Sequence, residues 1–156
     1  MTLLQKFFSF KGRLRRRDYW LCTLAIVAAT IVIVLPLVAG LMFGLKVEAA
    51  DPRLSALTLV CAWPSIAILV KRIHDRDKTG WMAANYWGPW TVSLLLSFFP
   101  EFGLGGFKVL LDIATTIVGV WFLIEFGFMD GTDGKNAYGP SPKGAEPTEK
   151  LADVFS

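Results

Sequence analysis

Metal-binding and redox residues are scarce in this sequence. Its 156 residues include two cysteines and one histidine, and neither a Cys-x-x-Cys nor a His-x-x-x-His spacing occurs. The zinc and disulfide frameworks that such spacings mark are therefore not indicated. Cys22 and Cys61 fall inside apolar runs, where thiols usually pack as small apolar groups. We expect no bound metal and no cofactor.

Catalytic signatures are also missing. The stretch Gly103-Leu104-Gly105-Gly106 lacks the lysine and the hydroxyl residue that complete a phosphate-binding loop. No serine elbow accompanies the lone His74, which argues against a hydrolase. We predict no catalytic residue and no nucleic-acid partner, and an enzyme is the least favoured class.

Charge is sparse and unevenly placed. Charged residues make up 19% of the chain against 54% hydrophobic residues, and the mean hydropathy is +0.50. A soluble domain of this length cannot bury so much apolar surface. The charges gather in short blocks between long apolar runs, which indicates membrane spans. We expect an all-α membrane protein with four transmembrane helices, at about residues 19–45, 54–70, 81–100 and 104–129.

Lysine and arginine are distributed asymmetrically about these four segments. In a four-span arrangement, 13 of the 16 basic residues fall on the side that carries both termini. Because positively charged loops are retained in the cytoplasm, both termini are predicted to be cytoplasmic.

The two ends of the chain differ in character from its middle. Residues 1–18 combine an apolar stripe, which begins with Leu3, Leu4, Phe7 and Phe8, with several cations, and predict an amphipathic helix at the membrane interface. This segment either recognises anionic lipid or only anchors the chain. Residues 130–156 predict a cytoplasmic turn followed by a disordered tail.

The densest polar cluster is the segment 71–80, between the second and third apolar runs. Three interpretations are open for it. Its arginines match the geometry of phosphate groups such as lipid headgroups. His74 and Asp75 form a candidate acid–base pair. Alternatively, the carboxylates only neutralise neighbouring arginines and fix a tight loop.

Three polar residues are predicted within the third and fourth spans. Asn85 lies near Pro89, which is expected to bend or break its helix. Asp112 follows Lys108 by one helical turn, so the two are expected to pair at an interface. Glu125 is expected either to pair near the inner interface or to bond the basic loop. These residues support the alternative function, a small transporter or channel subunit that acts as an oligomer.

Three short motifs together resemble a known family. They are Phe10-Lys11-Gly12-Arg13-Leu14-Arg15-Arg16-Arg17-Asp18-Tyr19-Trp20, Lys71-Arg72-Ile73-His74-Asp75-Arg76 with Thr79-Gly80-Trp81, and Asn136-Ala137-Tyr138-Gly139-Pro140-Ser141-Pro142. Their order and spacing resemble the domain-of-unknown-function 805 family of small bacterial inner-membrane proteins, over roughly residues 5 to 143. The resemblance implies an inner-membrane location and four spans, and it implies no mechanism.

All three motifs fall on the cytoplasmic side of the predicted topology. We therefore expect them to assemble into one polar cap, made of Arg13, Arg16, Arg72, His74, Asp75, Arg76, Asn136 and Tyr138. The leading hypothesis is an interaction or structural membrane protein whose cap binds lipid headgroups or a protein partner. Its expected partners are the bilayer, anionic lipids, and either further copies of itself or another membrane protein.

Overall fold

The computed structural model describes residues 2–43, 52–97, 99 and 103–143. Within these ranges the chain is helical, and the only β-type pairing is an isolated bridge between Asn136 and Gly139. The elements in order are α1 (Leu3–Phe8), α2 (Arg16–Met42), α3 (Pro52–Asp75), η1 (Gly80–Ala83), α4 (Ala84–Ser97), α5 (Gly105–Phe122) and η3 (Leu123–Phe128). The predicted all-α class is confirmed.

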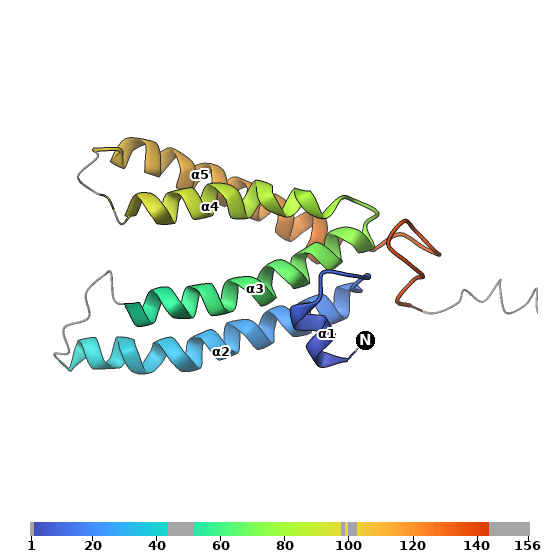
Figure 1. The fold of residues 1–156 in the computed structure, drawn as a ribbon, viewed down its shortest axis with the longest axis horizontal. Coiled ribbons are helices and arrows are strands. Elements are labelled where there is room, and N and C mark those ends of the chain that lie inside the picture. The colour runs from blue at the N-terminus through green and yellow to red at the C-terminus, as the bar shows by residue number, and fades with distance from the viewer. Residues whose placement is uncertain (1, 44–51, 98, 100–102, 144–156) are drawn as a thin grey trace, which may run out of the picture.

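The long helices form two hairpins, α2 with α3 and α4 with α5 (Figure 1). The hairpins meet at the end of the molecule where α1 and the segment after η3 lie, and they diverge toward the other end (Figure 1). The buried apolar residues gather where the hairpins meet. There Ile73 of α3 and Phe126 of η3 are both fully buried, in a cluster that also includes Ala83 and Phe122.

Away from this core the helices expose apolar side chains. On α2, Val32 and Leu35 are exposed, and on α5 the same is true of Leu110 and Ile117. Soluble monomers rarely expose apolar surface over such a length. The exterior of the hairpins is therefore the kind of surface that contacts lipid.

One helix in the described part of the chain is long and apolar enough to cross a membrane, judged by length and composition alone. It is the continuous helix Gly105–Phe128, formed by α5 and η3, which matches the predicted span 104–129. Within the described residues, none of the other three predicted spans meets this criterion. The helix α4, for example, has 14 residues, or about 21 Å at 1.5 Å per residue, against a hydrocarbon thickness of about 30 Å.

Two local expectations turn out differently. Within residues 2–18, the chain is helical only over Leu3–Phe8 and again from Arg16, because it is extended at Ser9 and turns at Gly12, whose φ is 91°. The helix α4 continues through Pro89 without a break. The predicted disordered tail, beyond residue 143, lies outside the described residues.

Candidate functional site

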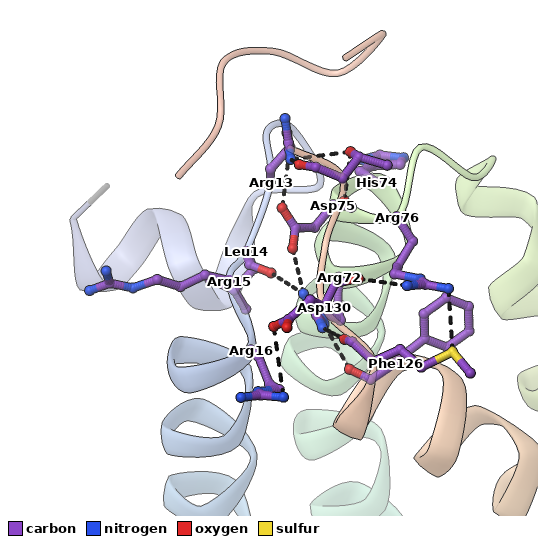
Figure 2. Close-up of polar contacts among 12 residues, drawn as sticks. Arg13, Leu14, Arg15, Arg16, Arg72, His74, Asp75, Arg76, Phe126 and Asp130 are labelled. Carbon is purple, nitrogen blue, oxygen red and sulfur yellow. Dashed lines mark hydrogen bonds and ion pairs between the residues drawn. The ribbon is translucent and has the colours of Figure 1, made fainter. Parts of the chain in front are cut away.

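Asp75 occupies the centre of the polar cap and is almost completely buried. Arg13 donates from Nε to Asp75 Oδ1 at 3.1 Å, and Arg72 donates from Nη1 to the other carboxylate oxygen (Figure 2). Arg72 precedes Asp75 by three residues on α3, so one helical turn brings their side chains together. Arg13 reaches the same carboxylate from the turn that follows Gly12. Each buried charge therefore has a partner, as burial away from water requires.

A second set of contacts involves the carbonyl groups at the end of η3. The last carbonyls of a helix lack partners within the helix and carry partial negative charge, which cations near the helix end stabilise. Here side chains from α2, from α3 and from Arg76, which directly follows α3, donate to the last three carbonyl groups of η3 and to the two that follow them. Arg72 donates to Phe126 at 2.7 Å and to Met129, Trp20 to Gly127 at 2.9 Å, Arg16 to Phe128 at 2.9 Å and Arg76 to Asp130 at 2.6 Å.

The segment after η3 folds back onto the same cluster. Asn136 donates from Nδ2 to the carbonyl of His74 at 2.9 Å, and the rings of His74 and Tyr138 stack with centroids 3.8 Å apart. The backbone N–H of Thr132 donates to the carbonyl of Asp75 at 2.8 Å. Arg13 also bonds this segment, by donating to the carbonyl of Gly134 at 2.6 Å. All three sequence motifs thus contact one another in the polar cap.

Two glycines are required by this packing. A Cβ atom at Gly131 would lie 2.0 Å from Asp75 Oδ2, and one at Gly80 would lie 2.9 Å from His74 Nε2. The chain can approach the buried carboxylate and the imidazole this closely only where no side chain intervenes. Gly131 and Thr132 were not among the predicted site residues, although the Asp130-Gly131-Thr132 turn that follows the last apolar run signals a close backbone contact.

Burial sets the electrostatics of the cap. Burial lowers the pKa of Arg72, and the adjacent Asp75 carboxylate counteracts part of that shift. Burial also lowers the pKa of His74, against the raising effect of the Gly12 carbonyl. Lys71 is fully buried, and burial lowers its pKa to about 8. Its Nζ donates to the carbonyls of Gln5 and Lys6 and so caps the end of α1.

The three predicted intramembrane polar residues lie apart. Glu125 accepts from Arg76 at 2.9 Å and from Lys78 at 2.6 Å, so it joins the basic loop. Asp112 pairs with Lys108 at 2.7 Å, far along α5 from the cap. Asn85 is exposed on α4. They do not form one polar path through the described helices, and the transporter alternative stays a prediction.

The outer edge of the cap contains a small basic hollow. It has a volume of about 240 Å³ and lies at the beginning of α2. Its lining contains five cations and two carboxylates, and one of these, Asp75, is already paired with Arg13 and Arg72. The side chains of Arg16 and Arg17 are half or more exposed, and that of Arg15 is over one-third exposed. The complete lining is Arg13, Arg15, Arg16, Arg17, Asp75, Asp130, Gly131, Thr132, Ser141, Pro142 and Lys143.

No group of three or more histidine, cysteine, aspartate or glutamate residues lies close enough to hold a metal ion within the described ranges. The donor chemistry that the cap does offer is guanidinium, amide and hydroxyl. Such groups bind anions, and phosphate oxygens in particular.

Comparison with known proteins places this all-helical chain in a family. The model of the family described as "Protein of unknown function (DUF805)" matches residues 7–140, and the chain belongs to that family. The resemblance inferred from the three motifs is confirmed. The family description assigns no activity.

Three relatives from Escherichia coli strain K12 are similar over most of their length. "Uncharacterized protein YiiR" is 33% identical over 89% of this chain and 89% of its own. "Inner membrane protein YhaI" is 32% identical, over 92% and 93%, and "Inner membrane protein YhaH" is 25% identical, over 92% and 94%. Two of these names support an inner-membrane location for this chain. No solved structure matches it.

Proposed function

We propose that this chain is a four-span inner-membrane protein with cytoplasmic termini, and that the exposed arginines of its polar cap bind the phosphate of an anionic lipid headgroup. The observation that carries the proposal is the basic hollow at the beginning of α2. It combines a concentration of cations with hydroxyl groups at the place where the first long helix begins. The bias of 13 basic residues to three supports a cytoplasmic position for this end.

The helix α1 supports contact of the cap with the bilayer. It lies at the cap end of the hairpins (Figure 1), and its Leu3 and Leu4 are both 72% exposed. Phe8 is also exposed. An apolar face beside a cluster of cations is typical of a helix that lies in a membrane interface. In that position the hollow faces the headgroup layer.

The arginines of the cap divide into two groups with different roles. Arg13 and Arg72 are buried, and their donors bond Asp75 and backbone carbonyls, so they hold the cap together. Arg15 and Arg17 bond only Asp18 among the described residues, at 3.3 and 3.9 Å. Exposed pairs of this kind contribute little stability and exchange readily for another anion. Headgroup binding is therefore assigned to the exposed arginines.

Native mass spectrometry from nanodiscs tests this proposal. The protein is reconstituted in phosphatidylcholine with added phosphatidylglycerol, and the retained lipids are identified. Replacing Arg15 and Arg17 together with glutamine is expected to reduce phosphatidylglycerol retention by at least tenfold, since each cation near a membrane surface contributes about 1 kcal/mol. Arg16 is left unchanged because it bonds the Phe128 carbonyl.

A matched control is Lys135→Gln, which removes an exposed cation outside the hollow. Equal retention by the double variant and by this control would contradict the proposal. Inorganic phosphate is added as a competitor to separate the two sources of phosphate. Displacement of the lipid at low millimolar phosphate would show that the hollow binds the free anion instead.

A further inference from the structure

A larger hollow lies between the two hairpins. It has a volume of about 730 Å³, which is in the range of ligand pockets, about 300–1,000 Å³. Residues of four helices line it, among them Val27 of α2, Leu69 of α3, Trp90 of α4 and Val120 of α5. We call it the inter-hairpin groove, since it occupies the region where the hairpins diverge (Figure 1).

Three hydroxyl groups along the groove are satisfied by their own helices. Ser65, Thr115 and Thr116 each donate a hydroxyl hydrogen to the carbonyl four residues earlier, at 2.7 Å. Their hydroxyl groups are thus not available as donors to an occupant. The remaining wall is mostly aliphatic and aromatic, and cavities with such walls do not retain water. The groove is accordingly suited to a hydrocarbon chain.

One wall residue is charged. Asp112 lines the groove and accepts from Ser93 of α4. Lys108, one turn nearer the start of α5, pairs with it at 2.7 Å. Both side chains remain substantially exposed, at 34% for Lys108 and 50% for Asp112. The Asp112 carboxylate in the groove wall thus has a cation beside it, at the end away from the polar cap.

This pair of charges is complementary to a zwitterionic headgroup. A phosphate can bond the Lys108 ammonium group while a primary ammonium group bonds the Asp112 carboxylate, and both bonds are charge-assisted. The charges are then satisfied by the ligand as well as by each other. A headgroup that carries only an anion would leave Asp112 facing a like charge.

We propose that the inter-hairpin groove binds a glycerophospholipid whose headgroup carries both a phosphate and a primary ammonium group, with an acyl chain between the hairpins and the headgroup at Lys108 and Asp112. This site is separate from the basic hollow of the polar cap, which lies at the opposite end of α5. This proposal and the proposed function can therefore fail independently of each other.

The test uses the full-length protein in nanodiscs that contain equal parts of phosphatidylethanolamine, phosphatidylcholine and phosphatidylglycerol. Native mass spectrometry then identifies the lipid retained after release. One phosphatidylethanolamine per chain is expected to remain in preference to phosphatidylcholine, whose methylated ammonium group cannot donate to Asp112. Asp112→Asn is expected to reduce that preference by about tenfold, the effect of losing about 1.4 kcal/mol.

Two bulky variants test the position of the chain. Thr116→Trp on α5 and Val27→Trp on α2 fill the groove from opposite walls and are expected to abolish retention. Ile117→Trp is the matched control, because Ile117 is exposed on α5 and lies outside the groove lining. Using both walls keeps the test decisive if one variant fails to fold, and fluorescence-detected gel filtration identifies such a failure.

Three results would overturn the proposal. The first is equal retention of phosphatidylethanolamine and phosphatidylcholine by the unmodified protein. The second is unchanged retention in both groove-filling variants. The third is a dimer that Thr116→Trp dissociates and Ile117→Trp does not, which would show that a second copy of the chain occupies the groove.

Discussion

Arg72 of α3 donates from Nε to the carbonyl of Phe126 in η3 at 2.7 Å. This bond connects the two hairpins at the end where they meet, and the same guanidinium group also reaches Asp75 and the Met129 carbonyl. One buried arginine therefore terminates one helix, pairs with a carboxylate and fixes the turn that follows. The polar cap first of all connects the two hairpins, and ligand binding is proposed only for its exposed edge.

Asp75→Asn is expected to destabilise the fold severely. The change leaves two buried guanidinium groups without their anion, and breaking a buried ion pair in this way costs about 3–5 kcal/mol. The free energy of unfolding in detergent micelles measures the effect.

Asp133→Asn is the matched control for this carboxylate. Its side chain is 77% exposed and lies 3.8 Å from the Lys143 ammonium group, so an effect of at most about 1 kcal/mol is expected. Similar losses in the two variants would show that the buried carboxylate does not hold the cap together.

Gly131→Ala tests the close approach of the backbone to Asp75. Because the added methyl group would lie 2.0 Å from Oδ2, the turn or the carboxylate must move, and overpacking of this kind costs about 1–3 kcal/mol. Gly106→Ala adds the same methyl group to α5 in open space, where alanine is the better helix former. A thermal unfolding scan should show a lower midpoint for the first variant only.

The stability of the cap is expected to depend on pH through His74. Burial lowers its pKa in the folded state below the ordinary value of 6.5, so between these two values the unfolded chain binds more protons than the folded one. The contribution of this residue is fully present above pH 6.5 and is lost as the pH falls below it.

Unfolding midpoints of the unmodified protein and of His74→Gln, measured between pH 7.5 and 5.5, isolate this contribution from other titrating groups. On acidification, the unfolding midpoint of the unmodified protein should fall further than that of His74→Gln. Parallel curves, or a relative gain for the unmodified protein at low pH, would refute a lowered pKa for His74 in the folded state.

The proposed topology predicts an alternating pattern of thiol accessibility. In a background that lacks the native cysteines, single cysteines are introduced at the exposed positions Lys11, Phe43, Thr79, Leu104 and Lys143. A membrane-impermeant maleimide applied to intact cells should label positions 43 and 104, and it should label the other three only after lysis. Labelling of position 43 and position 79 from the same side would rule out α3 as a span.

Local sequence was sufficient for the all-α class of the fold. Helix content, the span over 104–129 and the basic bias toward one side follow from hydropathy and charge along short stretches, and these properties are set by each segment's own residues. The motif residues that form the polar cap were also recognisable, since all of them fall at the same end of the apolar runs. The lengths of the middle helices were less predictable, because η1 takes up the first turns of the expected third span and shortens α4.

Only the tertiary structure separated the structural arginines from the exposed ones. Arg13, Arg15 and Arg17 are near neighbours of one chemical type, yet Arg13 is buried against Asp75 while Arg17 is largely exposed. The difference depends on acceptors more than 60 residues away, the Asp75 carboxylate and the Gly134 carbonyl. Every residue has a backbone carbonyl. The sequence therefore does not indicate which carbonyl groups at the end of η3 accept side-chain hydrogen bonds, because this depends on how the helices pack together.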